Sequence, residues 1–166
     1  MTPPDPAMRE VARQLADVLE VVLPRLRELS EAQGGEGRYP GAWSRKQVLG
    51  HLVDSATNNL HRFVRAQIPG ELAFPGYEQE EWVRVEAWEE RPWPEIVELW
   101  AALNRHVAHV IAHITPEGRA VSCRIGSGEP VTLAFVAEDY VRHLRHHLSQ
   151  ILEPEAAGGR KHERWA

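Results

Sequence analysis

Apolar and polar positions alternate at the period of an α-helix over four long stretches of the chain. Between residues 11 and 29, apolar side chains recur at steps of three and four, and the pattern stops near the sequence QGGEG at 33–37. This spacing places them on one face of an amphipathic helix. A second helix is expected from Ser44 to just before Pro69, because Ser44 and Gln47 have the spacing of a capping box.

The second half of the chain carries the other two helical patterns, at residues 91–115 and 132–152. Residues 74–91 combine Gly and Pro with mixed charges, which indicates a long loop with one short helix, and loops of this length tend to be functional. Residues 119–131 alternate around a Gly-Ser-Gly turn and predict a small β-hairpin. The expected fold class is all-α: a four-helix bundle with a long connection between its second and third helices and a small hairpin before the last.

Length and composition narrow the class of protein. The 166 residues fit one domain, which we place at residues 1–152, followed by a flexible tail at 153–166. The net charge is −5 with both signs interspersed, so no basic field attracts nucleic acid or anionic lipid. No apolar run approaches the roughly 18 residues of a membrane span. Because Cys123 is the only cysteine, an intrachain disulfide is excluded and a reducing compartment fits. We expect a cytoplasmic protein without nucleic-acid or membrane partners.

Candidate metal chemistry comes from the nine histidines. His143 and His147 are four residues apart in one predicted helix, and His109 and His113 are four apart in another. Two imidazoles at this spacing lie one above the other on a helix and can bind one cation. At about 100° per residue, His143 and His147 flank the apolar stripe of their helix, whereas His146 points away from that stripe. On the other helix, His109 points away from the apolar face. Orientation therefore favours the pair at 143 and 147.

A cation held by two side chains of one helix needs a third ligand, and His51 is the natural candidate. It shares a polar strip with Asn58 and Arg62 that lies nearly opposite the apolar stripe of the same helix. A site there requires this helix to be contacted on two sides, by the bundle core and by a pocket or a partner subunit. From the residues alone, three readings stay open: a metal site on the helix at 132–152, one on the helix at 91–115, or histidines that are only solvated or hydrogen-bonded.

Three stretches of the sequence resemble, in order, the three blocks of the DinB-like superfamily, which includes the YfiT-type metal-dependent hydrolases. They are WSRKQVLGHLVDSATNNLHRFVRAQ at 43–67, YEQEEWV at 77–83 and EDYVRHLRHHLSQI at 138–151. The resemblance implies a four-helix bundle that binds a divalent metal, zinc or nickel, through three histidines. Carried onto this sequence, the ligands are His51, His143 and His147, with His146 a neighbour that does not bind the ion.

The resemblance also implies an enzyme. Three protein ligands leave one coordination position open, where the ion could activate water or a thiol. The expected function is hydrolysis or thiol-dependent transfer on a small molecule, with a low-molecular-weight thiol as a second partner. The alternative is a non-catalytic bundle in which the metal only joins the helices and the protein serves as an interaction or stress-response module. We also expect a homodimer, a common state for small soluble proteins.

Five further residues are candidates for orienting a ligand ring or contacting substrate. They are Asp54, Asn58, Tyr77, Gln79 and Gln150. The first two follow His51 on its helix and the last follows His143, and simple solvation is the alternative for each. Tyr77 and Gln79 belong to the block that covers the pocket in the family, where Glu80 replaces the usual aspartate. Arg62 is a candidate for binding an anionic group, but an ordinary exposed arginine is the favoured interpretation.

Overall fold

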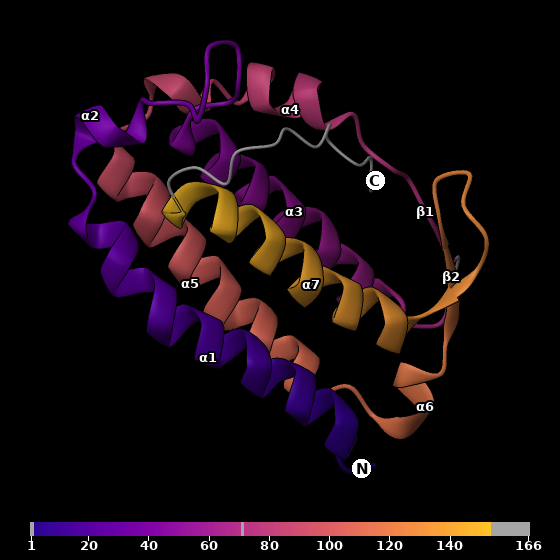
Figure 1. Ribbon diagram of the computed structural model, residues 1–166. Coiled ribbons are helices and arrows are strands. Elements are labelled where there is room, and N and C mark those ends of the chain that lie inside the picture. The colour runs from indigo at the N-terminus through magenta and orange to yellow at the C-terminus, as the bar shows by residue number, and fades with distance from the viewer. Residues whose placement is uncertain (1, 71, 154–166) are drawn as a thin grey trace.

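Four long helices form the body of the protein, which we describe from a computed structural model over residues 2–70 and 72–153. They are α1 (Pro6–Glu28), α3 (Arg45–Arg65), α5 (Trp93–Ala112) and α7 (Leu133–Leu152). Figure 1 shows them side by side as a bundle, so the predicted four-helix architecture is confirmed. Residues 154–166 of the predicted tail lie outside the described residues.

The helices begin at caps that are visible in the sequence. Ser44 accepts a hydrogen bond from the backbone N–H of Gln47, and the Gln47 side chain accepts one from the backbone N–H of Ser44, which is the predicted capping box of α3. Asp5 accepts from two backbone N–H groups at the start of α1, and Thr132 caps α7. Each cap satisfies backbone donors that the helix itself leaves open.

Neighbouring helices of the bundle run antiparallel in two pairs. The backbone N–H of Asp5 donates to the carbonyl of Ile114 at one end of the α1–α5 pair, and Arg27 pairs with Glu98 near the other. In the α3–α7 pair, the ring of His51 lies beside that of His143, while Phe63 packs edge-on against Tyr140. The first half of α3 therefore faces the second half of α7.

Short elements fill the connections. They are α2 (Glu31–Gly34), β1 (Ala73–Phe74), α4 (Gln79–Val85), η1 (Trp88–Glu90), α6 (Pro116–Arg119), β2 (Ser122–Ile125) and β3 (Val131–Thr132). The antiparallel pairing of β2 with β3 confirms the expected hairpin, and α4 is the expected short helix of the long connection. The parallel pairing of β1 with β2 was not expected, because a two-residue strand has no readable period. This pairing holds the long connection against the hairpin at one end of the bundle (Figure 1).

Helix α3 is buried on both of its sides, as a histidine site on its polar strip requires. A Cβ atom added to Gly50 would lie 2.2 Å from Cγ of Trp88, so the indole packs directly on the helix backbone. Ala87 has a left-handed backbone, with φ of 52°, and this turn delivers Trp88 to the helix. The second side of α3 is thus covered by the chain's own connection.

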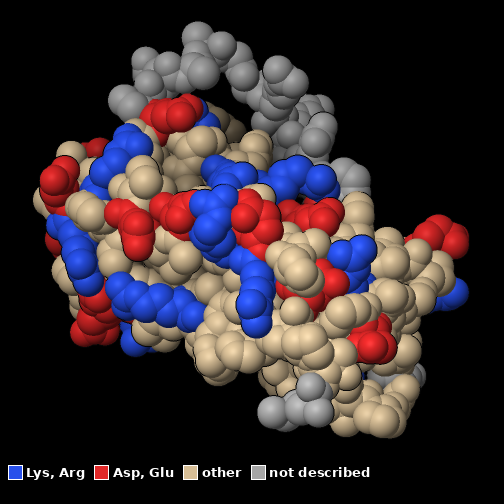
Figure 2. All heavy atoms as spheres, turned by 90° about the horizontal axis from the view of Figure 1, so that it is seen from below, with Lys and Arg blue, Asp and Glu red and all other residues tan. Residues whose placement is uncertain are grey.

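The surface carries both signs of charge. Figure 2 shows basic and acidic side chains interspersed over the face it displays. Within the part of the chain that the structure describes, no helix has the length and apolar character needed to cross a membrane.

Candidate metal centre

The rings of His51, His143 and His147 converge between α3 and α7. Their centroids lie 4.5 to 5.2 Å apart, with each pair nearly edge-on. One nitrogen of each ring lies within 4.8 Å of the other two, and Nε2 of His51 is 3.3 Å from Nε2 of His143. Within residues 2–70 and 72–153, this is the one group of three or more His, Cys, Asp or Glu side chains with such geometry.

The donor set fits a divalent transition metal. Zinc binds histidine nitrogen at about 2.0–2.1 Å in a tetrahedral arrangement, which places two ligand nitrogens roughly 3.3 Å apart. The separation between His51 and His143 has this value, and the three ligand nitrogens all lie within 4.8 Å of one another. Three imidazoles suit zinc, nickel, copper or iron and leave a coordination position for another ligand.

His147 is held by a side chain that follows it on α7. Its Nδ1–H donates to Oε1 of Gln150 over 2.8 Å, because an amide oxygen can only accept. The amide nitrogen of Gln150 lies 3.2 Å from Nε2 of His146 and donates to it, which fixes the orientation of the amide. Nε2 of His147 is therefore the nitrogen that carries a lone pair, the form that a metal requires.

Removing the Gln150 amide is expected to weaken metal binding without unfolding the protein. Partners that orient a ligand ring typically contribute about 10- to 100-fold in metal affinity. We expect Gln150→Leu to lose zinc affinity by this factor in a competition titration against a chromophoric chelator. Ser149→Ala is the matched control, since the Ser149 hydroxyl donates only to the backbone of His146. Equal affinity in Gln150→Leu and the wild type would show that the amide does not orient His147.

Burial sets the protonation state of His143 in the ring cluster. His51 is fully buried, and His147 is 8% exposed. Burial, together with the nearby His146, lowers the pKa of His143 to about 4. At neutral pH this imidazole is neutral, and only the neutral ring binds a metal.

A cavity of about 590 Å³ opens beside the histidines. His143 lines it, together with Tyr77 of the long connection and Tyr140 of α7, while the turn of the β2–β3 hairpin forms another wall. Burial raises the pKa of Tyr77 to about 12, so its hydroxyl keeps its proton, and Tyr77 is hydrogen-bonded to Ser55. A molecule in this cavity can therefore approach the histidine cluster from the side of His143.

Asp54 is a buried carboxyl group one turn after His51. It is 2% exposed, and Oδ2 accepts a hydrogen bond from Nε1 of Trp88. Burial, with a smaller contribution from the charge of Glu86, raises the pKa of Asp54 to about 7, although the bond from Trp88 opposes the shift. This residue holds the indole that covers α3.

Because the pKa of Asp54 is raised, removing its carboxyl group is expected to stabilise the protein in a pH-dependent way. A carboxyl group whose pKa is higher in the folded protein than in the unfolded chain loses stabilisation as the pH rises from about 4 through about 7. In metal-free protein, Asp54→Asn should therefore raise the free energy of unfolding at pH 8, on the order of 2 kcal/mol. The gain should vanish at pH 4. Urea unfolding of both proteins at the two pH values measures it, and a gain independent of pH would contradict the assignment.

The other two predicted residues lie on α3 and at the start of α4. Asn58 is half-buried and donates to the backbone carbonyl of Asp54 within its own helix. Gln79 begins α4, is half-buried and is not among the residues that line the cavity. His109 on α5 and His113 at the C-cap of that helix are close to each other but exposed, in agreement with the orientation argument.

Sequence reasoning was wrong about Arg62, which is 4% exposed and lines the cavity. Its position on the polar strip of α3 indicated solvent, but the connection after α3 folds back over that strip. Reasoning from the sequence also missed Trp43, whose ring lies 5.5 Å from that of His51, and Trp88. Gly50, directly before His51, was the one signal in the sequence that a large side chain packs on this part of α3.

Comparisons with known proteins agree with this architecture. The sequence matches the DinB superfamily over residues 4–151, nearly the whole chain. The protein belongs to this superfamily, as the three sequence blocks indicated. A comparison with curated proteins gave no match.

Two solved structures are similar to this chain. One is YfiT from Bacillus subtilis, described as a probable metal-dependent hydrolase with an unusual four-helix bundle topology; the TM-score is 0.65 and the identity 21%, over 89% of this chain and 81% of that one. The other is a mutant of a mycothiol-dependent maleylpyruvate isomerase, with a TM-score of 0.69 and 15% identity. That match covers 90% of this chain but 62% of the isomerase chain. At these identities the likeness establishes the shared fold.

Proposed function

We propose that this protein is a metal-dependent enzyme in which His51, His143 and His147 hold a divalent ion, zinc or nickel. The reaction is hydrolysis or a thiol-dependent transfer on a small molecule. One observation carries this proposal: His143 belongs to the three-histidine cluster and also lines a cavity large enough for a small molecule. When bound, the ion would supply the Lewis acidity that makes a water or a thiol reactive near pH 7.

The residues of the chain have separate parts in this proposal. Gln150 keeps Nε2 of His147 available, and burial keeps His143 neutral. Tyr77 presents a protonated hydroxyl in the cavity, where it can donate a hydrogen bond to a bound molecule. The cavity walls shield the reacting groups from bulk water, which strengthens such interactions.

The two similar structures support the two reaction classes. YfiT is described as a probable hydrolase, and the isomerase as dependent on the thiol mycothiol. Both structures share the fold of this chain, so the fold does not choose between the two kinds of chemistry. We further propose a cytoplasmic protein, as the composition indicates, and a homodimer, which is a common state for small soluble proteins.

Whether a small molecule can reach the metal distinguishes an enzyme from a helical bundle in which the metal only joins the helices. Cobalt(II) in place of zinc has a visible spectrum that reports its ligands, and 2-mercaptoethanol is a small thiol that fits the cavity. We expect the thiol to add a sulfur-to-metal charge-transfer band to the cobalt protein in a saturable titration. A cobalt spectrum that neither this thiol nor azide changes would indicate a sealed site and favour the non-catalytic bundle.

A further inference from the structure

Arg62 is a buried cation in the wall of the cavity that His143 also lines. It stands in the last turn of α3, and its neighbour Phe63 packs against Tyr140, which lines the cavity as well. An arginine keeps its charge in proteins, and a buried charge is costly unless an opposite charge or strong hydrogen bonds compensate it. The buried charge of Arg62 therefore needs an opposite charge or strong hydrogen bonds beside it.

The described part of the chain gives Arg62 only neutral partners. Nη1 donates to Oδ1 of Asn59 and Nη2 donates to the carbonyl oxygen of Pro75, both over a long 3.3 Å. Its nearby titratable groups are Tyr77 and Cys123, and neither is charged at neutral pH. No ion pair within 4.0 Å includes Arg62 among the described residues. The guanidinium has five N–H donors, and most of them donate no hydrogen bond to the described residues.

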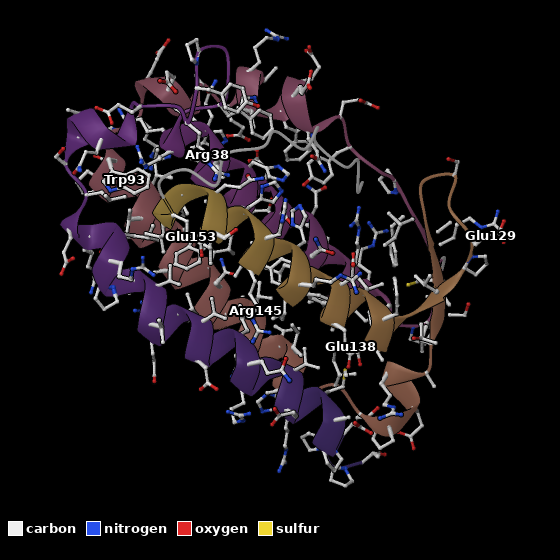
Figure 3. All side chains as sticks on the ribbon, in the orientation of Figure 1. Arg38, Trp93, Glu129, Glu138, Arg145 and Glu153 are labelled. Carbon is white, nitrogen blue, oxygen red and sulfur yellow. The ribbon has the colours of Figure 1, made fainter. Side chains whose placement is uncertain are left out.

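The acidic residues of the cavity do not neutralise this charge. Glu78 and Glu129 are exposed, and Figure 3 shows Glu129 on the turn between β2 and β3, away from the helices. Asp139, which is half-buried, is paired with Arg142. The cavity is thus positive at its buried wall and negative at its exposed rim. This polarity suits a molecule whose anionic group lies at the buried wall, away from the acidic rim.

We propose that Arg62 binds a carboxylate group of the molecule that reacts at the histidine cluster, so that the substrate or the thiol is an acid. This inference rests on the proposed function for the reacting end of the molecule. A planar guanidinium matches a carboxylate through two parallel hydrogen bonds. The pairing supplies the opposite charge that the described residues do not, and it orients the bound molecule along the cavity.

The helix geometry sets the length of this molecule. His51 and Arg62 are eleven residues apart on α3, or about 16 Å along the helix axis. On α7, Tyr140 precedes His143 by three residues, or about 5 Å. A six-carbon chain with a thiol at one end and a carboxylate at the other has a length between these two spans, which makes it a suitable probe.

The first part of the test needs no metal. In metal-free protein, the Nε–Hε resonance of Arg62 is followed by ¹H–¹⁵N spectroscopy and assigned from its loss in Arg62→Lys. We expect a saturable shift with hexanoate and none with 1-hexanol. Arg65, one turn along α3 and exposed, is the control resonance. A hexanoate effect that is absent at Arg62, or equal at Arg65, would overturn the proposal.

The second part uses the cobalt protein and three thiols: 6-mercaptohexanoate, 6-mercapto-1-hexanol and the short acid 3-mercaptopropionate. Arg62→Gln should weaken the binding of 6-mercaptohexanoate about 10- to 100-fold, because a charged hydrogen-bonded pair is lost. The alcohol and the short acid should bind as before, and Arg65→Gln should change none of the three.

The outcomes separate the two proposals. If no thiol binds cobalt, the proposed function fails, and the hexanoate titration still decides the role of Arg62. If the thiols bind but the acid and the alcohol lose equal affinity in Arg62→Gln, the carboxylate site is wrong. A merely structural Arg62, bonded to Pro75 at the end of its helix, would lower the melting temperature in this variant without distinguishing the thiols.

Discussion

Replacing His51 with alanine is expected to remove the bound metal almost completely. His51 is the one member of the cluster that comes from α3, so its loss leaves two ligands on a single helix. Residues that only orient a ligand contribute about 10- to 100-fold in affinity, so loss of a ligand itself should cost more than about 100-fold. Metal analysis of zinc-loaded, purified protein by mass spectrometry should find near-stoichiometric zinc in the wild type and almost none in this variant.

Two more variants complete that experiment. His147→Ala should lose the ion as His51→Ala does, because it removes a ring of the same cluster. His109→Ala should keep it, since His109 is exposed on α5 and belongs to the other pair spaced by four residues. Loss of zinc in His109→Ala with retention in the other two would move the site to α5.

Adding one methyl group at Gly50 is expected to destabilise the fold strongly. The new Cβ would meet three ring atoms of Trp88 at 2.2 to 2.5 Å, and Trp88 is only 3% exposed. The indole would have to leave its place and release Nε1 from Asp54. Overpacking of this kind costs about 3 kcal/mol, which we expect as the loss in free energy of unfolding for Gly50→Ala in urea titrations of metal-free protein.

A double mutant separates this contact from other effects of the alanine. In a Trp88→Ala background the obstacle is gone, and alanine favours a helix interior over glycine by about 1 kcal/mol. Gly50→Ala should therefore reverse its sign there and become stabilising. The same loss in both backgrounds would mean that Trp88 is not the cause.

Local patterns predicted the helices and one part of the site. The capping box of Ser44 and Gln47, and the shared face of His143 and His147, depend on residues within one turn of each other, which spacing reveals directly. The place of His51 depended on what covers the second side of α3. That cover is Trp88, 37 positions further along the chain, and no local period encodes such a contact.

Arg62 shows most clearly what local patterns in the sequence cannot predict. The helical period placed it on a polar strip, and a polar strip normally faces water. Its burial arises because β1 pairs with β2 and brings the backbone of Pro75 over the end of α3. The predicted homodimer, the cytoplasmic location and the low-molecular-weight thiol depend on partners outside the chain and stay predictions.

X-ray absorption at the zinc edge of the loaded protein tests the central claim most directly. We predict three imidazole nitrogens at about 2.0–2.1 Å and one light atom from an exchangeable ligand, with the imidazole scattering reduced in His143→Ala. A fourth protein ligand, a sulfur from Cys123, or an unchanged spectrum in His143→Ala would contradict an open three-histidine centre.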